Sequence, residues 1–378
     1  MSQDAGSGGT RDSTPLEVRA SDAVIRRMAA RAAVNGAKPV ERVAPGIKIE
    51  PGMSADAPDD ELQLARQMGF EYVQVYGPGS GSPDLRGAAP GTFIPTYDYL
   101  ARVVERFERV GLKIYNWGNW RSEAIIRGLP HRDEAIAGYA GMLRDLGRVG
   151  IPCTTYAHWS VIPELFRTEP EPIRGGARAP GFDAGRAAAA IAHLRHGRAY
   201  SEREIWDNFA TFVARAAPAA EDAGVWIALH PDDPPLPSMA GVPRCIFSSF
   251  SGYERALAIA DSPNVGVCLC TGCWLEGGDA MGKTVLEAIH AFGAMRKLFH
   301  VHFRNVSAPL PHFVETFVDD GYMDMYLVMK ALREVGYRGG VAPEHTPAMV
   351  GQRRVGVAFT FGYVKALLER ANAEAGGP

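Results

Sequence analysis

Residues of metal-ligating types stand at the ends of four successive apolar runs in the second half of the chain. These residues are His230, Cys270, His302 and Glu344, and the runs are 225-VWIALH-230, 265-VGVCLC-270, 298-LFHVHFRN-305 and 340-GVAPEH-345. Two imidazoles, a thiolate and a carboxylate suit a divalent transition metal such as Zn, Mn, Fe or Co. We therefore predict that the four side chains bind one divalent metal ion.

The choice of ligands has alternatives within the same runs. His300 lies two residues before His302 and so shares its strand face, and Cys268 stands in the same relation to Cys270. Cys273 lies beyond the run and receives no ligand role. Each of these residues alone also has a structural explanation, since a cysteine in an apolar strand is often a small buried side chain.

Residues near these runs are candidates for catalysis and for substrate binding. His345 is the predicted acid or base, because an ordinary histidine titrates near physiological pH. Arg304 is predicted to act in catalysis as a bidentate clamp on a substrate carboxylate, with a salt bridge inside the protein as the alternative. Asp232 and Asp233 are predicted to contact substrate or to anchor their loop, and Asn116 is a further predicted substrate contact.

Strand-like and helix-like segments alternate along the chain from residue 46. The strand-like runs are 46–50, 71–77, 112–118, 151–158, 225–230, 265–270, 298–305 and 340–345. Helical patterns occur at 59–70, 97–111, 133–150, 184–195, 202–224, 322–336 and 356–371. This alternation predicts an α/β fold, a (β/α)₈ TIM barrel of parallel strands, with an open doubly wound sheet as the alternative. A barrel would bring the four ligand side chains together at one rim.

The predicted domain organisation is a single barrel with an N-terminal extension. Residues 1–44 are interpreted as a mobile segment plus a short helix at 21–35, and residues 45–378 as the barrel. Two stretches rich in Gly, Pro and polar residues, 78–95 and 163–184, follow predicted strand ends. Barrel enzymes carry their substrate loops there, so we expect that role for both stretches.

The composition of the chain argues against nucleic acid and membranes as partners. The chain has 378 residues, of which 46% are hydrophobic and 22% charged, with a net charge of −3. We expect a globular cytoplasmic protein that binds neither nucleic acid nor membrane, because no basic face, signal peptide or long apolar run is present in the sequence. The five cysteines, an odd number, are interpreted as thiols in a reducing compartment.

Several motifs together resemble the mannonate dehydratase family of the xylose-isomerase-like TIM barrel superfamily. The matching segments lie within residues 95–350 and include 229-LHPDDPPLP-237, 261-DSPNVGVCLCTG-272 and 302-HFRNV-306. The resemblance implies a homo-oligomeric, metal-dependent lyase that dehydrates a sugar acid, D-mannonate, to 2-keto-3-deoxy-gluconate. It also implies that His230, Cys270, His302 and Glu344 bind Mn²⁺.

The chain departs from the family pattern at several positions. Glu344 stands where the family has an aspartate, Val314 and Val318 replace two histidines of an FHExxH-like stretch, and Ser122 replaces another histidine. We interpret the chain as a divergent member that has kept the metal platform and altered the substrate or the reaction. A metal-dependent sugar isomerase or epimerase on the same barrel, or a non-enzymatic binding protein, are the alternatives.

Overall fold

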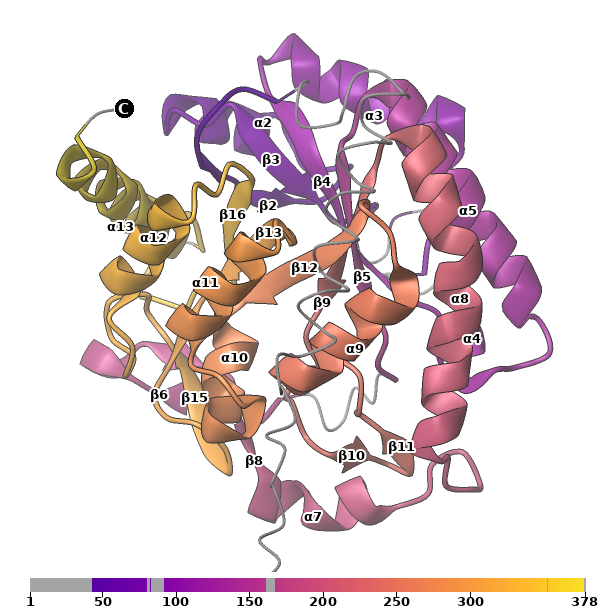
Figure 1. Ribbon diagram of the computed structural model, residues 1–378. Helices are drawn as coiled ribbons and strands as arrows, with labels where there is room; N and C mark the ends of the chain where they lie inside the picture. The colour runs from indigo at the N-terminus through magenta and orange to yellow at the C-terminus, as the bar shows by residue number, and fades with distance from the viewer. Residues whose placement is uncertain (1–42, 80–81, 83–91, 161–166, 352, 377–378) are drawn as a thin grey trace, which may run out of the picture.

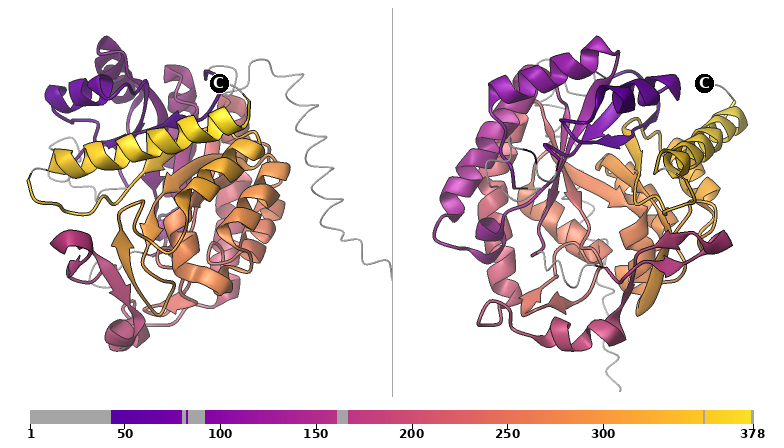
Figure 2. Two further views of the ribbon diagram at one scale, coloured as in Figure 1. Left: turned by 90° about the vertical axis from the view of Figure 1, so that its left-hand side faces the viewer. Right: turned by 180° about the vertical axis from the view of Figure 1, so that it is seen from behind.

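The computed structural model describes residues 43–79, 82, 92–160, 167–351 and 353–376, and its centre is a curled sheet surrounded by helices (Figures 1 and 2). The strand order is β1-β16-β13-β12-β9-β5-β4-β3-β2, with parallel neighbours throughout. The strands are β1 (Lys48–Ile49), β2 (Gly52–Met53), β3 (Tyr72–Val75), β4 (Lys113–Trp120), β5 (Cys153–Ala157), β9 (Trp226–His230), β12 (Val265–Cys270), β13 (Leu298–Phe303) and β16 (Gly340–Pro343). This arrangement confirms the predicted TIM barrel.

The two end strands of the sheet are halves of one chain segment. β1 pairs with β16 and β2 pairs with β3, and only Glu50 and Pro51 lie between the halves. Glu50 N–H donates to the carbonyl of Val341 at 2.8 Å, and the carbonyl of Pro51 accepts from Gln74 N–H at 3.1 Å. The first predicted strand therefore closes the ring, and it divides at a proline that has no N–H for a ladder.

Helices connect successive strands along the outside of the sheet. They are α2 (Asp59–Gln67), α3 (Tyr97–Arg109), α4 (Glu123–Arg127), α5 (Arg132–Val149), α7 (Ala184–Ala192), α8 (Glu202–Ala223), α9 (Phe250–Ala260), α10 (Thr271–Gly277), α11 (Val285–Ala294), α12 (Met325–Glu334) and α13 (Arg353–Glu374). The sequence predicted α2, α3, α5, α7, α8, α12 and α13, but it did not predict α4, α9, α10 and α11. The predicted helix at 21–35 lies outside the described residues, and the domain boundary at residue 44 stays a prediction.

Loops at the carboxyl end of the barrel carry small sheets. The strands involved are β6 (Glu171–Pro172), β7 (Arg178–Ala179), β8 (Gly181–Asp183), β10 (Ser238–Met239), β11 (Val242–Pro243), β14 (Asn305–Val306) and β15 (His312–Thr316). β8 lies antiparallel to β15, and β15 lies antiparallel to β14. The part of the predicted loop at 163–184 that the structure describes, residues 167–184, therefore packs through β8 against the segment that follows β13. Among the described residues, no helix is both long and apolar enough to cross a membrane.

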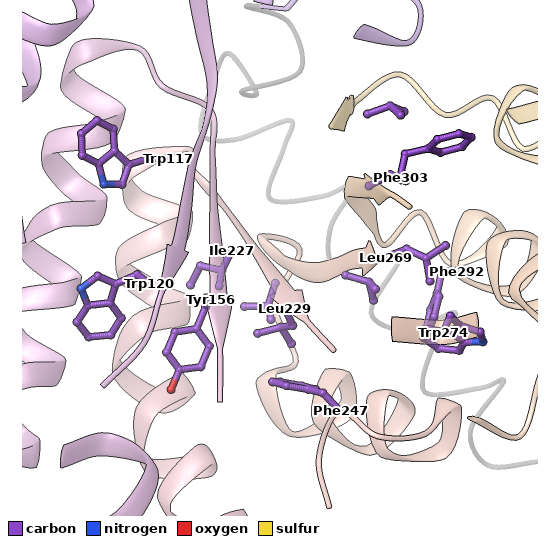
Figure 3. Close-up of a cluster of buried hydrophobic side chains, with 14 of the residues drawn as sticks. Trp117, Trp120, Tyr156, Ile227, Leu229, Phe247, Leu269, Trp274, Phe292 and Phe303 are labelled. Carbon is purple, nitrogen blue, oxygen red and sulfur yellow. The ribbon is translucent and has the colours of Figure 1, made fainter. Parts of the chain in front are cut away.

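The period of two along each strand separates the apolar core from the site. Ile227 and Leu229 of β9 and Leu269 of β12 belong to the buried cluster between sheet and helices (Figure 3). Residues of the opposite parity, including His230 and Cys270, turn to the inside of the barrel, because successive side chains of a strand alternate in direction. The same hydrophobic pattern that packs the helices therefore directs the polar side chains inward.

Gly340 on β16 gives a test of the closure of the ring. A Cβ at this position would overlap the carboxyl group of Glu50, which is fully buried and lies 3.2 Å from His300 through its Oε2. We expect Gly340→Ala to lower the free energy of unfolding by about 1–3 kcal/mol through overpacking. The control is Gly362→Ala on α13, where a Cβ meets open space, and it should gain roughly 0.5–1 kcal/mol. Urea unfolding of both variants measures the difference, and a Gly340→Ala protein as stable as wild type would contradict this packing.

Candidate metal centre

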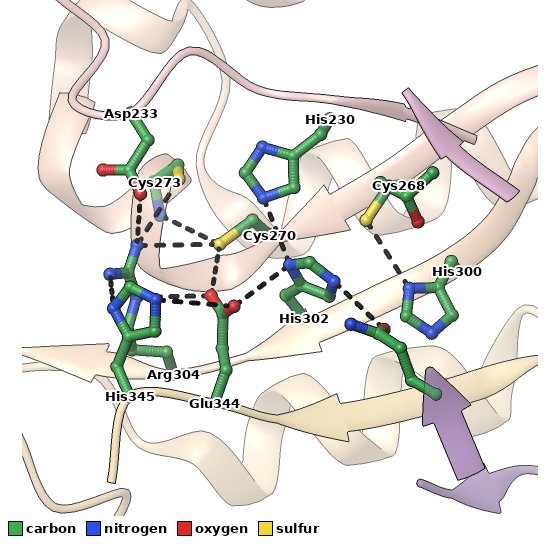
Figure 4. Close-up of polar contacts among 12 residues, drawn as sticks. His230, Asp233, Cys268, Cys270, Cys273, His300, His302, Arg304, Glu344 and His345 are labelled. Carbon is green, nitrogen blue, oxygen red and sulfur yellow. Dashed lines mark hydrogen bonds and ion pairs between the residues drawn. The ribbon is translucent and has the colours of Figure 1, made fainter. Parts of the chain in front are cut away.

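The four side chains selected from the sequence meet at the carboxyl ends of four neighbouring strands (Figure 4). His230 Nε2 lies 3.1 Å from His302 Nδ1, which lies 3.2 Å from Glu344 Oε2. Cys270 Sγ lies 3.3 Å from Glu344 Oε1. Cys270, His302 and Glu344 also form a group close enough to share one metal ion. The structure thus brings all four together, and their ligation of a metal stays a prediction.

Hydrogen bonds on the far side of both imidazoles decide which nitrogen carries a lone pair. His230 Nδ1 lies 2.7 Å from the carbonyl oxygen of Pro231, and His302 Nε2 lies 3.3 Å from Oε1 of Gln74. Both partners are acceptors, so each of these nitrogens carries the hydrogen. In the neutral imidazoles, His230 Nε2 and His302 Nδ1 are then the nitrogens that carry lone pairs, and these two nitrogens face each other. Second partners of this kind orient the histidine ligands of most metal sites.

Cys270 adds a negatively charged sulfur to the same point. Burial alone would raise the pKa of its thiol, but hydrogen bonding from Cys273 and the charge of Arg304 hold that pKa well below its usual range. The N–H of Cys273 donates to Cys270 Sγ at 3.5 Å, and Arg304 Nη2 donates to the same sulfur at 3.7 Å. A thiolate has no hydrogen to offer Glu344.

The cluster as a whole therefore consists of acceptors: two imidazole nitrogens, a thiolate and a carboxylate. Such atoms repel one another at these distances, and a shared cation turns the repulsion into attraction. Mixed sulfur, nitrogen and oxygen donors are those of a divalent transition-metal site. The donor set accordingly fits a metal ion.

The alternative ligands His300 and Cys268 lie deeper in the barrel. Cys268 Sγ lies 3.6 Å from His300 Nδ1, and His300 Nε2 lies 3.2 Å from Glu50 Oε2. Cys268, His230 and His302 also form a group close enough for one ion. Burial, however, raises the pKa of the Cys268 thiol well above its usual value. A neutral thiol is a poor ligand, so the geometry and the charge favour Cys270.

Arg304 lies at the centre of a buried ion cluster beside these ligands. Its side chain is 1% exposed, with Nη2 at 2.9 Å from Glu276 Oε1 and Nη1 at 2.5 Å from Glu315 Oε1. Asp233 Oδ2 lies 3.7 Å from Nη2, and Glu344 Oε1 lies 3.6 Å from Nε. The structure thus occupies the guanidinium with protein carboxylates. This favours the salt-bridge alternative over the predicted clamp on substrate, which stays untested.

Arg167, from the loop that follows β5, joins the same ion cluster. Its Nη2 lies 2.8 Å from Asp233 Oδ1, its Nε lies 2.8 Å from Glu315 Oε1, and Glu276 Oε1 lies 3.4 Å away. Two guanidinium groups therefore face three buried carboxylates. Asp233, a predicted substrate contact, serves here to hold its loop against Arg167.

His345 is the most exposed member of the site, with 31% of its side chain accessible. Its Nδ1 lies 2.7 Å from Glu315 Oε1, and its Nε2 lies 3.7 Å from Glu344 Oε2. Burial opposes its protonation, but Glu315 and Glu344 raise the pKa of His345 above its usual value. Its backbone has a φ of 51°, a strained conformation for a residue other than glycine. Such strain is common where a side chain must point in a functional direction.

The other two predicted substrate contacts are buried. Asp232 is 1% exposed, its N–H donates to the carbonyl of Phe247 at 3.1 Å, and burial raises the pKa of its carboxyl to about 7. Asn116 is fully buried, and its Nδ2 donates to Thr155 Oγ1 at 2.7 Å and to Gln74 Oε1 at 3.2 Å. Substrate contacts for both side chains stay predictions.

Some residues of the site were not predicted from the sequence. Glu315 had a visible signal, because it is the glutamate within 313-FVETFV-318. Gln74 and Glu50 also had a signal, because each is a polar residue within a predicted apolar strand. Arg167 and Glu276 had none, and only their proximity in the folded structure reveals them.

Comparison with known proteins finds one family and related structures. The family model for D-mannonate dehydratase matches residues 164–371, more than half of the chain. The mannonate dehydratase of Oceanobacillus iheyensis is 30% identical over 259 residues, which cover 61% of this chain and 71% of that protein. Mannonate dehydratase 2 of Halalkalibacterium halodurans is 29% identical over 255 residues, covering 61% and 72%.

Among solved structures, the mannonate dehydratase from Streptococcus suis serotype 2 superposes with a TM-score of 0.76 and 25% identity. The match covers 88% of this chain and 97% of that one. L-ribulose 3-epimerase superposes with a TM-score of 0.52 and 15% identity. The second likeness concerns the fold alone.

Replacement of Arg304 separates the salt-bridge role from the clamp role. Arg304→Met would leave Glu276 and Glu315 buried without their counter-charge, and we expect a loss of roughly 3–5 kcal/mol of unfolding free energy. The matched control is Arg174→Met, which removes an ion pair with Asp319 from an arginine whose side chain is 44% exposed. That change should cost no more than about 1 kcal/mol. Denaturant unfolding of both variants measures the two effects; unchanged stability in Arg304→Met together with lost activity would support the clamp.

Proposed function

Because this chain belongs to the D-mannonate dehydratase family and is thus a sugar-acid dehydratase, we propose that it converts D-mannonate to 2-keto-3-deoxy-gluconate with Mn²⁺. The proposal also includes a homo-oligomer, as the resemblance implies. One observation carries the mechanism. Four metal-ligating side chains from four neighbouring strand ends face one point, with 3.1 Å between His230 Nε2 and His302 Nδ1, 3.2 Å between His302 Nδ1 and Glu344 Oε2, and 3.3 Å between Cys270 Sγ and Glu344 Oε1.

His230, Cys270, His302 and Glu344 are the residues proposed to hold the metal. A divalent ion bound there would act as a Lewis acid toward the carboxylate and the adjacent hydroxyl of the sugar acid. The four side chains would keep their orientation through their outer hydrogen bonds. Glu344 is longer than the family's aspartate by one methylene, so its carboxylate reaches the cluster from the residue that follows β16.

His345 is proposed to remove the proton from C2 of the substrate. His345 Nδ1 lies 2.7 Å from Glu315 Oε1 and 2.8 Å from Arg304 Nη1. In the proposed tautomer Nδ1–H donates to the Glu315 carboxylate, which leaves the lone pair on Nε2 as the base. The proton moves from C2 to Nε2 and is then given to the hydroxyl that departs from C3, which leaves as water and restores the neutral imidazole. The resulting enol then tautomerises to the 2-keto acid. Glu315 also stabilises the imidazolium, since a buried carboxylate favours the charged ring.

Arg304 and Arg167 are proposed as positioning residues for this base. Both hold Glu315, Arg304 at 2.5 Å and Arg167 at 2.8 Å. Burial raises the pKa of the Glu315 carboxyl, but the charge of His345 and the two guanidinium groups together hold that pKa well below its usual value. Asp232, Asp233 and Asn116 are proposed to shape the floor and the loop of the site.

Val314 and Val318 bear on the choice of substrate. Both are buried, at 8% and 4% exposure. They supply apolar surface where the resemblance implies imidazoles, and they flank the retained Glu315. We propose that the site accepts other sugar acids as well as D-mannonate.

The direct test is turnover by the purified full-length protein with Mn²⁺. We expect a 2-keto-3-deoxy acid from D-mannonate or from another member of a panel of aldonates. The same reactions in deuterated water, followed by mass spectrometry, detect an isomerase or epimerase as deuterium incorporation without loss of water. That result, or silence on the whole panel, would overturn the proposed dehydratase activity on these acids.

The role of His345 has its own test. Asparagine tolerates the left-handed backbone of this position, so His345→Asn removes the base without a new backbone strain. We expect kcat to fall by about 100- to 10,000-fold, as for loss of a general base, with Mn²⁺ affinity and unfolding free energy near wild type. The control is His312→Asn on β15, an exposed histidine with 48% accessible side chain. Activity of His345→Asn equal to that control would exclude His345 as the base.

A further inference from the structure

A file of buried polar side chains runs down the inside of the barrel, away from the four proposed ligands. It starts at His302, passes through the amides of Gln74 and Asn116, and ends at His300 and Glu50. All five side chains are fully buried. None of them has a role in the reaction steps described above, apart from His302 as a ligand.

We propose that Gln74, held by Asn116, is a positioning residue that fixes the tautomer of His302 and thereby the affinity of the site for its metal. The inference rests on the proposed metal centre. The metal would bind His302 through Nδ1, and this nitrogen is available only when the hydrogen sits on Nε2. Gln74 controls that choice, because its Oε1 is the atom that faces Nε2 at 3.3 Å.

Asn116 decides which end of the Gln74 amide faces His302. Its Nδ2 lies 3.2 Å from Gln74 Oε1, 2.7 Å from Thr155 Oγ1 and 3.3 Å from His300 Nδ1. A rotated Gln74 amide would set two NH₂ groups against each other. The donor character of Asn116 therefore keeps the Gln74 oxygen toward His302.

His300 and Glu50, at the far end of the file, have hydrogen-bond directions that agree with this orientation of Asn116. His300 Nδ1 faces two donor groups, Asn116 Nδ2 at 3.3 Å and the Cys268 thiol at 3.6 Å, so its hydrogen lies on Nε2, which faces Glu50 Oε2 at 3.2 Å. Glu50 itself is fixed by its place between β1 and β2 at the closure of the ring.

The other tautomer of His302 would be disfavoured at both nitrogens. A bare Nε2 would face the lone pairs of Gln74 Oε1, and a hydrogen on Nδ1 would occupy the position that the metal needs. Outer hydrogen bonds of this kind change metal affinity by about 10- to 100-fold when they are removed. The file thus extends from the interior of the barrel to the proposed metal centre, and the donor and acceptor roles along it fix the tautomer of His302.

Gln74 allows a matched pair of variants. Gln74→Met keeps the length of the side chain and removes the acceptor. Gln74→Glu keeps an acceptor toward His302, and it sacrifices no hydrogen bond of the amide nitrogen, because Gln74 Nε2 has no partner among the described residues. Thr154→Val is the control: it removes a buried hydrogen bond of β5, from Thr154 Oγ1 to the carbonyl of Trp117 at 2.7 Å, outside the file.

The experiment measures Mn²⁺ affinity of the metal-free full-length protein by competition with a chelator. We expect Gln74→Met to bind Mn²⁺ about 10- to 100-fold more weakly, while Gln74→Glu and Thr154→Val stay near wild type. Wild-type affinity in Gln74→Met, or an equal loss in Thr154→Val, would overturn the proposal.

A second measurement needs no variant. Nitrogen-15 NMR of the imidazoles in metal-free wild-type protein should place the His302 hydrogen on Nε2, and a hydrogen on Nδ1 would overturn the inference. This measurement decides the case if Gln74→Met does not fold. It also separates the two proposals: wild type that binds no Mn²⁺ rejects the proposed metal centre, whereas the NMR result alone tests the tautomer.

Discussion

The mutual repulsion of four acceptor groups at one rim of the barrel is the constraint on which the rest of the site depends. His230, Cys270, His302 and Glu344 come from different strands and face one another with lone pairs and negative charge. Only a rigid scaffold can hold such groups together. The closed ring of parallel strands supplies that rigidity, since each strand end is fixed by two neighbours and by helices packed outside it.

The charges around this point are offset from two sides. Arg304 and Arg167 face the thiolate and the carboxylates from the loops above the strands. From below, the amide of Gln74 accepts the Nε2 hydrogen of His302, and Asn116 and His300 continue this series of hydrogen bonds into the barrel. The site therefore depends on two sets of residues. In the ion cluster, loss of one partner leaves a buried charge uncompensated, and in the file of polar side chains the donor–acceptor direction of each hydrogen bond fixes the next.

The sequence predicted the barrel from the alternation of strand-like and helical segments. It predicted the meeting of the four side chains from their positions at the ends of four apolar runs. A residue such as His230 at the end of an apolar run must lie at a strand end, and strand ends in a parallel barrel share a rim. The sequence could not place Arg167 or Glu276. Their position depends on how loops fold over the barrel, and no local pattern encodes that. Arg304 and Asn116 illustrate the converse case: their types suggested substrate contacts, but burial and protein partners occupy them.

Metal K-edge X-ray absorption of the Mn²⁺-loaded protein tests the central claim most directly, because it reports the elements bound to the ion. The account predicts a mixed shell with sulfur, imidazole nitrogen and carboxylate oxygen, and loss of the sulfur contribution in Cys270→Ser. A shell of oxygen and nitrogen alone in the wild-type protein would contradict it, as would a sulfur signal that persists in Cys270→Ser.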